Sequence, residues 1–440
     1  MIRMAHRSGH VTAALLATLG SIVFAEGTSR ADAADTVARA QDEFIRAHGD
    51  RPIAAIRVEG LQRTRPAVVQ QWLECSAGEP LSTCDLPEIR ERLYRLAIFS
   101  SIEVALEEQP EGVEIVFRFE EKWSLYPVPM LWYSPGTAIA GLILVESNLF
   151  GYNKGLAVGG VYSNRGWYAL AGYNDPNIAY TNAWGSLHAF FGSTQLENQR
   201  PDGTVEQSFD LKRLDVETVL GWTFWDHVSP CWTGGLRLAR VGDVRVPGNE
   251  AAADAIVTVQ GLSVIYSDRR YRDLYDEGLR LSVDVQHAFP LERATRPYDD
   301  AFFDVKWAHS APLRGFLDAR AHGFLGSMPV VFEERLGGLD GSRTLPGSGL
   351  VAADRYGSLS LDYQVPFLTL APGTATAGIF GEVGRYSRND DPPVTYGGPG
   401  AGLRFYLRKV AIPAVGVDAG YEVGSEHVRF SVSVGYRPAR

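Results

Sequence analysis

The 440-residue sequence has a single long apolar segment without charges, and that segment lies at the extreme N-terminus. The mean hydropathy of -0.09 is too low for a protein that crosses a membrane with several helices, which excludes a helical transporter or channel. Basic residues are also fewer than acidic ones: the sequence has 42 Lys and Arg and 52 Asp and Glu, which gives a net charge of -10. This balance argues against a general nucleic-acid-binding protein, so we expect no nucleic-acid partner.

Methionine and cysteine are scarce, with four and three residues, whereas glycine and aromatic residues are abundant. Forty-six Gly, 20 Phe, 19 Tyr and nine Trp suit sheets and tight turns. A hydrophobic fraction of 45% also excludes disorder for the bulk of the chain. The composition therefore predicts a folded, mainly β protein.

Residues 1–33 read as a secretory signal and its cleavage region. Arg3 and Arg7 precede the apolar run Val11–Phe24, and small residues follow at Ala31 and Ala33. The run is shorter than the roughly 20 residues that span a bilayer, which favours a cleaved signal over an anchor. We expect residues 34–50 to form a linker and the mature chain to leave the cytosol.

The three cysteines fit an oxidising compartment. Cys75 and Cys84 are close in sequence, and we predict a disulfide between them, which leaves Cys231 without a partner. No Cys-x-x-Cys or His-rich spacing indicates a metal site, so we expect neither a metal nor another cofactor.

Residues 51–123 predict a small α/β domain whose elements follow the order βααββ. Asp85, with Glu88 three residues later, is a variant of the pattern that opens a helix. The expected elements are the strand Ile53–Val58, the helices Pro66–Leu73 and Asp85–Leu96, and a hairpin of Ile102–Leu106 and Val113–Phe119.

From residue 124 to 440, apolar and polar residues alternate in one segment after another. In Gly278–Gln286, for example, Leu281 and Val283 alternate with Ser282 and Asp284. Roughly fifteen such segments occur, many of nine or more residues, which is the length that membrane strands need. Since bacterial single-chain barrels have even strand numbers, we predict an antiparallel transmembrane β-barrel of about 16 strands. A large secreted β-sandwich or propeller is the alternative.

Three stretches resemble one known family. Ile56–Gly60, followed by two helices and Leu96–Ile102, looks like a POTRA domain, with Ala97 where Gly is commoner. The turn of Asn148, Leu149, Phe150 and Gly151 resembles the first external turn of the barrel in the BamA/TamA-type outer-membrane assembly superfamily, the bacterial surface antigens. The segment Phe332–Gly338 with Arg343, and the strand Leu361–Pro366, are similar to that family's sixth external loop and the strand after it. Together the three cover nearly all of the mature chain.

The resemblance implies that this loop folds back into the barrel, where an arginine pairs with acidic residues of the inner wall. Gly337 and Gly338 precede Arg343 at the family spacing, and Asp362 and Glu382 match the acidic partners. The neighbours of Arg343 depart from the family motif. Another register places Pro346 at the arginine position, and a solvated Arg343 is the second alternative.

The resemblance also implies a function in the insertion, assembly or translocation of outer-membrane or secreted proteins of a Gram-negative bacterium. The periplasmic POTRA domain would capture unfolded clients by strand addition, at an edge that includes Ile53–Val58 or Ile102–Leu106. The barrel would accept client strands, or thin the bilayer, at a seam between Thr137–Glu146 and Val428–Tyr436. Gly141 and Gly435 would weaken that seam or serve barrel curvature. The implied partners are outer-membrane lipid, client polypeptides and accessory periplasmic proteins.

Two further function classes stay open. A single POTRA domain also fits a partner-secretion pore or passive channel with the loop as its plug. We find no Gly-x-Ser-x-Gly, His-Glu-x-x-His or phosphate-loop motif, so we expect no enzyme. An outer-membrane hydrolase with Ser and His on the outer barrel wall is a remote alternative.

Overall fold

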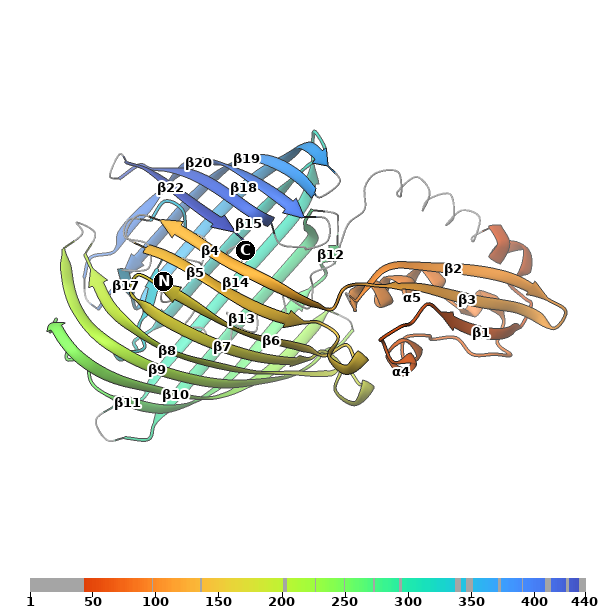
Figure 1. Cartoon of the computed structure of the whole chain (residues 1–440), viewed down its shortest axis with the longest axis horizontal. Coiled ribbons are helices and arrows are strands. Elements are labelled where there is room, and N and C mark those ends of the chain that lie inside the picture. Colours follow the sequence, from red (N-terminus) through yellow and green to blue (C-terminus); the bar gives the residue numbers. More distant parts are fainter. Residues whose placement is uncertain are drawn as a thin grey trace.

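The computed structural model describes residues 43–96, 98–134, 137–200, 204–225, 227–248, 250–271, 274–292, 295–336, 342–345, 351–370, 373–389, 391–407, 413–424 and 427–434. The expected signal, most of the expected linker, Ala97, Gly337, Gly338, Pro346 and Gly435 lie outside these ranges. Two units follow one another along the long axis of the molecule, a small domain that ends at Glu121 and a closed barrel that begins at Leu125 (Figure 1).

The small domain has the predicted order of elements. These are β1 (Ile53–Glu59), α4 (Pro66–Gln70), η1 (Leu81–Thr83), α5 (Leu86–Arg95), β2 (Phe99–Gln109) and β3 (Gly112–Glu121). The central strand is β3, parallel to β1 and antiparallel to β2. Helix α5 begins after Asp85 because the carboxylate of Asp85 accepts a hydrogen bond from the Glu88 amide at 3.0 Å.

The core of the small domain lies between its helices and one face of its sheet. Val69, Leu93 and Phe117 are fully buried there. Residues 43–48 are helical, and Phe44 and Ile45 pack against this core. The end of the segment expected as a linker is therefore part of the small domain.

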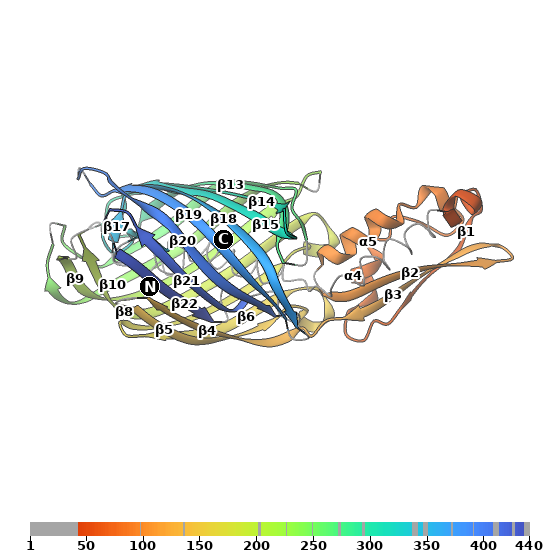
Figure 2. The same ribbon diagram turned by 90° about the horizontal axis from the view of Figure 1, so that it is seen from above.

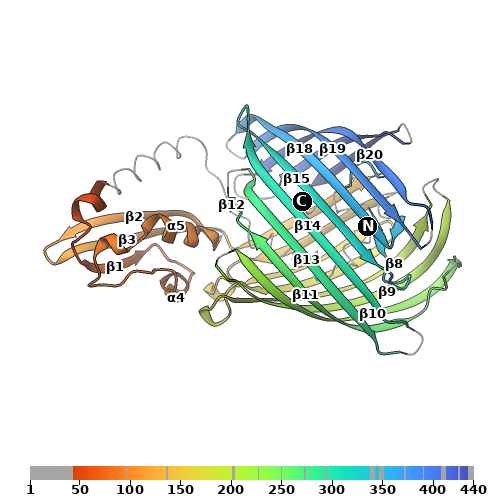
Figure 3. The same ribbon diagram turned by 180° about the vertical axis from the view of Figure 1, so that it is seen from behind.

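Sixteen long antiparallel strands close into the barrel, as the strand lengths in the sequence predicted. They are β4 (Leu125–Ser134), β5 (Thr137–Glu146), β6 (Gly155–Ser163), β7 (Gly166–Asp175), β8 (Ala183–Gln199), β9 (Val205–Trp222), β10 (Val228–Val246), β11 (Ala255–Ser267), β13 (Asp276–Pro290), β14 (Tyr298–Ala311), β15 (Gly315–Gly326), β18 (Arg355–Leu370), β19 (Gly373–Ser387), β20 (Val394–Leu407), β21 (Pro413–Glu422) and β22 (His427–Val434). A two-residue strand, β12 (Arg270–Tyr271), adds to β13 at one end. Pairing of β22 with β4 closes the cylinder. The view from behind shows β11, β13, β14, β15 and β18 side by side on the opposite part of the wall (Figure 3).

Side chains alternate between the two faces of the barrel wall. In β13, Val283 and Val285 are exposed on the outer face, whereas Asp284 and Gln286 are buried on the inner face. The apolar outer face and the polar interior agree with the alternation in the sequence. Within the described ranges, no helix is long and apolar enough to cross a membrane.

The barrel wall has two heights. The strands β21, β22, β4, β5, β6 and β7, which we call the short wall, have 8–10 residues each. The other long strands, the tall wall, have 12–19 residues (Figure 2). With a rise of about 3.4 Å per residue and a tilt near 40°, the short wall stands about 20–26 Å high and the longest strands about 45–50 Å.

Two expectations about the start of the barrel are wrong. The first strand is β4, which precedes the Thr137–Glu146 segment that the sequence suggested. An additional first strand reverses the direction of every later turn, so the Asn148–Gly151 turn lies at the end that carries the small domain, opposite to the end at which it was expected. Its contact with the small domain supports that placement, because the Arg65 amide donates to the Gly151 carbonyl oxygen at 2.9 Å.

Candidate functional site

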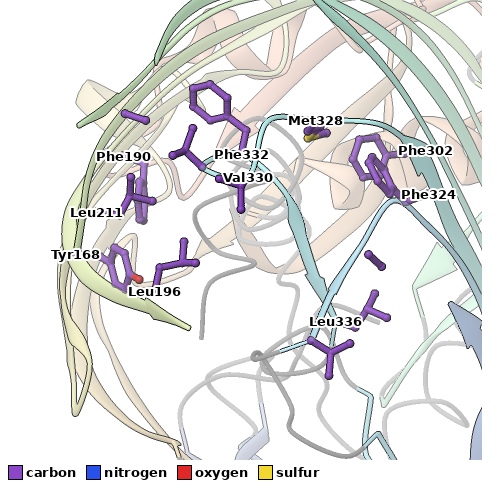
Figure 4. Close-up of a cluster of buried hydrophobic side chains, with 14 of the residues drawn as sticks. Tyr168, Phe190, Leu196, Leu211, Phe302, Phe324, Met328, Val330, Phe332 and Leu336 are labelled. Carbon is purple, nitrogen blue, oxygen red and sulfur yellow. The ribbon is translucent and has the colours of Figure 1, made fainter. Parts of the chain in front are cut away.

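The connection between β15 and β18 turns into the barrel interior. Met328, Val330, Phe332 and Leu336 are all buried there (Figure 4). Two three-residue strands, β16 (Glu334–Leu336) and β17 (Val351–Ala353), pair with one another and form the stem of this lumenal loop. The loop therefore occupies the lumen, as the family resemblance implied.

Arg343 docks the tip of the lumenal loop on the inner wall. Its Nη1 and Nη2 atoms each donate to one oxygen of Asp362, both at 2.9 Å. The Arg343 and Asp362 side chains are 7% and 3% exposed, so this two-pronged ion pair is shielded from solvent. A guanidinium can donate two parallel hydrogen bonds to one carboxylate, whereas a lysine ammonium cannot form this bidentate geometry.

Glu382 on β19 binds the backbone and side chains of the same tip. Its carboxylate accepts hydrogen bonds from the Arg343 amide at 3.0 Å, from the Ser342 hydroxyl at 2.6 Å and from the Thr344 hydroxyl at 3.2 Å. The Arg343 guanidinium carbon also lies 3.4 Å from the centre of the Phe380 ring. Ser342 and Thr344 replace the family's motif neighbours, and here both hydroxyls contribute to docking.

A third acidic residue completes the dock, and sequence reasoning missed it. Asp418 on β21 lies 3.8 Å from Arg343 Nη1 and 2.8 Å from Arg404 Nη2. Next to it, Gly420 lets the loop approach closely, because a Cβ there would lie 2.9 Å from the Arg343 carbonyl oxygen. Asp418 occupies the inward parity of its strand, which is the signal that could have found it.

A second contact holds the stem of the loop, independently of the tip. Glu333 is 3% exposed and receives two hydrogen bonds of 2.9 Å from the Arg388 guanidinium, which follows β19. Arg388 also binds Glu206 of β9 at 2.7 Å, and Arg213 of β9 lies 5.2 Å over the Phe332 ring. The stem therefore bridges two separate parts of the tall wall.

The seam between β22 and β4 has the fewest described pairs of any junction between long strands, and the described part of β22 ends at Val434. It contains three residue pairs, Leu131 with Val434, Trp132 with Ser433 and Tyr133 with Val432. Every other junction between long strands has at least seven described pairs, and β8 with β9 has seventeen. Three pairs span only about 10 Å along a strand.

The four-residue turn that resembles the family forms a joint with the small domain. The Asn148 side-chain amide donates to the Thr64 hydroxyl at 2.9 Å, and both residues are buried. Gly151 has a φ of +80°, and a Cβ there would lie 2.1 Å from the Arg63 carbonyl oxygen. Arg63 also binds Glu146, the last residue of β5, at 2.7 Å. Leu149 and Phe150 shape the turn, with Phe150 74% exposed.

The small domain contains one disulfide, and β1 and β2 form the two edges of its sheet. Cys75 and Cys84 are bonded to each other, and Cys231 is a buried free thiol in the barrel. The start of β1 is covered, because Ile53 exchanges backbone hydrogen bonds of 2.8 Å with Gly78 and Glu79. On the outer edge of β2, which is an edge strand of the three-stranded sheet, the Ile102 amide donates to the Tyr94 hydroxyl at 3.0 Å.

The described residues contain no group of three or more His, Cys, Asp or Glu side chains that could hold a metal ion. The arrangement combines a barrel, a loop docked in its lumen and a sheet with an edge strand, all of which suit binding and movement of polypeptide.

The geometry defines a class, a closed 16-stranded barrel with a docked lumenal loop and an N-terminal α/β domain. No family model matches the sequence, and no curated protein matches it. Solved structures do match. BamA from Haemophilus ducreyi lacking POTRA domains 1–3 superposes with a TM-score of 0.59 at 12% identity, over 87% of this chain and 84% of that one.

Two other solved structures give the same result. CdiB from Escherichia coli has a TM-score of 0.60 at 15% identity, over 88% of this chain and 76% of that chain. CdiB from Acinetobacter baumannii has a TM-score of 0.57 at 13% identity, over 88% and 74%. The chain therefore has the barrel fold of BamA and CdiB.

Proposed function

We propose that this chain belongs to the BamA/TamA-type superfamily and acts in the outer membrane of a Gram-negative bacterium. There it inserts or translocates outer-membrane or secreted proteins, and its small domain is a periplasmic POTRA domain. The apolar outer face of the barrel supports the membrane location, since exposed apolar bands of this extent are typical of lipid contact. The fold shared with BamA and CdiB agrees both with insertion and with translocation of proteins.

The seam between β22 and β4, which has three described pairs up to Val434, carries the proposal. Each backbone hydrogen bond contributes only about 0.5–1.5 kcal/mol net, so these three pairs by themselves add little to the closure of the barrel. The seam also lies in the short wall, whose height of about 20–26 Å barely reaches the roughly 25 Å apolar band of such membranes. A weak closure in a thinned bilayer is where a client strand would enter.

A disulfide across the seam tests this role. Trp132 and Ser433 face one another as a non-hydrogen-bonded pair, the type with the shorter Cα separation. We expect the pair Trp132→Cys/Ser433→Cys, oxidised in proteoliposomes, to abolish assembly of an added unfolded barrel protein, and reduction to restore it. Full assembly by the oxidised protein would contradict the proposal.

A matched pair elsewhere in the short wall provides the control. Gly160 and Ala169 are also opposite one another, on β6 and β7, inside a nine-pair junction. The pair Gly160→Cys/Ala169→Cys introduces a disulfide at a junction that the proposal does not open. We expect oxidation of this pair to leave assembly unchanged.

Client capture is proposed for the outer edge of β2. Because the Ile102 amide points away from β3, the amide of Leu106, four residues on, has the same direction. A proline there removes one outward donor and leaves the β3 ladder intact. We expect Leu106→Pro to weaken binding of an unfolded client at least threefold relative to Leu106→Ala, in titrations followed by fluorescence anisotropy. Equal affinities would contradict capture at this edge.

A partner-secretion pore or passive channel is the second candidate, and the docked loop is the observation that favours it. Arg343, Asp362 and Glu382 hold the tip across the lumen, as a plug requires. Conductance in planar bilayers separates the candidates. Large, stable conductance after deletion of residues 337–350, with no assembly of barrel clients, would favour a pore.

A further inference from the structure

The first barrel strand carries two prolines, Pro127 and Pro129, within its domain-proximal half. Proline has no backbone N–H group, so it cannot donate to a neighbouring strand. Both side chains lie on the exposed outer face of the wall, between Leu125 and Leu131. Their effect on the barrel depends on which neighbouring strand their backbone nitrogen faces.

One hydrogen bond fixes that direction. The Ser147 amide donates to the Ser124 carbonyl oxygen at 2.8 Å, in continuation of the β4–β5 ladder. In an antiparallel pair, successive residues point alternately to the two neighbours. Even-numbered residues of β4 therefore bond to β5, and the odd-numbered residues face the seam. Both prolines face the seam, as Leu131 and Tyr133 do.

The described pairing follows this pattern. The β4–β5 ladder runs without interruption over ten pairs, since neither proline faces it. The seam ladder pairs Tyr133 with Val432 and Leu131 with Val434, where the described part of β22 ends. Whatever lies opposite Pro129 and Pro127 receives no N–H group from them.

The membrane makes this loss costly. An unpaired backbone group costs several kcal/mol in hydrocarbon, so a strand in lipid needs a donor for each acceptor. An edge with carbonyl oxygens but no amides at two successive seam positions takes only hydrogen-bond donors. Trp123, 81% exposed just before β4, has the amphipathic ring that is enriched at membrane–water interfaces.

We propose that Pro127 and Pro129 stop the seam from closing over its domain-proximal half. The seam is thereby held to a short ladder around Leu131 and Tyr133, with an acceptor-only edge beneath it that water, or the N–H groups of a passing strand, can satisfy. This inference deepens the proposed function, and its relevance to clients rests on the seam being the working part of the barrel.

The test restores the missing donors with Pro127→Val/Pro129→Val. Valine favours strands and suits an exposed apolar face, so we expect the barrel to fold. Amide hydrogen exchange of residues 125–134, in lipid nanodiscs, reports seam pairing directly. We expect the amides of Leu131 and Tyr133 to exchange about tenfold more slowly, and the new amides at positions 127 and 129 to be protected, because the ladder lengthens.

A proline elsewhere gives the matched control. Pro399 in β20 is exposed and also faces a neighbouring strand, β21, whose pairing begins at Gly400. We expect Pro399→Val to leave exchange in residues 125–134 unchanged. Rapid exchange at positions 127 and 129, with Leu131 and Tyr133 unaffected, would overturn the inference, as would an equal effect of Pro399→Val.

A second measurement separates the inference from the proposed function. Slower seam exchange together with at least threefold slower client assembly supports both. Slower seam exchange with unchanged assembly supports the proline stop and contradicts the role of the seam in assembly. Each of the single variants Pro127→Val and Pro129→Val restores one donor, so we expect each to slow seam exchange less than the double variant does.

Discussion

The short wall and the tall wall are built from the same kind of strand but are held by different forces. On the inner face of the tall wall, buried ion pairs join neighbouring side chains, such as Arg213 with Asp215 at 2.8 Å and Arg320 with Asp304 at 2.9 Å. On the inner face of β4, β5 and β6, the buried side chains are apolar except for Ser163: Val128, Met130, Ile139, Ile143, Val145, Ala157 and Val161. The outer face there is apolar as well.

This difference indicates which part of the cylinder can open. Long ladders, ion pairs and the docked loop all reinforce the tall wall, so its separation requires the loss of many contacts together. In β4, β5 and β6 of the short wall, the buried inner face is mainly apolar, and such non-directional packing tolerates rearrangement. On the other side of the seam, β21 contributes Asp418 to the dock, and Glu422 of β21 pairs with Arg429 of β22 at 2.8 Å. The seam lies in the wall that loses least on opening.

The largest expected effect comes from breaking the dock on the tall wall. Arg343→Glu places a carboxylate beside Asp362, and loss of one partner of a buried pair costs about 3–5 kcal/mol. We expect a lower thermal midpoint and higher conductance. Rescue by Asp362→Arg would support the pairing, whereas additive effects of the two changes would contradict it. Arg240→Glu, in an exposed pair with Asp254, is the control.

The second-largest effect is expected from a mutation that creates a cavity on the inner face of the short wall. Ile143 is 1% exposed, and truncation of such a side chain costs about 2–4 kcal/mol. We expect Ile143→Ala to lower the urea midpoint of the barrel in lipid vesicles. The same change at Ile379, 64% exposed on the outer face of the tall wall, is the reference, and an equal effect there would remove the distinction between the two faces.

The small domain is a third region for comparison, because it lies outside both walls of the barrel. Its disulfide closes a short loop between Cys75 and Cys84, for which chain entropy predicts about 2–3 kcal/mol. We expect Cys75→Ser/Cys84→Ser to lower the unfolding midpoint of the small domain and to leave that of the barrel unchanged. Calorimetry of the full chain resolves the two transitions, and a shift of both would show that they unfold as one.

The smallest effect is expected at Gly420, where a Cβ would lie 2.9 Å from the Arg343 carbonyl oxygen. Gly420→Ala forces a displacement of a few tenths of an ångström and should weaken docking by about 1 kcal/mol. We expect roughly a fivefold rise in channel opening. At Gly424 a Cβ would meet nothing within 4 Å, so Gly424→Ala is expected to change nothing.

The sequence predicted the barrel and the order of the small domain because both depend on local periodicity. Alternation in strands such as β13 and β18 is visible residue by residue. The first strand was not predicted, because Leu125–Ser134 lacks that alternation and contains Pro127 and Pro129, which argue against an interior strand. That single omission also assigned the Asn148–Gly151 turn to the wrong end.

The lumenal dock could be predicted only in part. Arg343, Asp362 and Glu382 came from the family resemblance, and the structure brings all three together. Asp418 and the Glu333–Arg388 contact were missed, because they join residues from distant strands that become neighbours only when the cylinder closes. No local pattern encodes such a contact.

The two anchors of the lumenal loop have a mechanical consequence. Its stem is bonded to Arg388 and packs on β9, and its tip is bonded to β18, β19 and β21. Cross-braces inside a cylinder resist shear between the strands that they join. Lateral pressure from the membrane would therefore deform β4 to β7, to which neither of these two anchors is bonded, before it distorted the braced strands.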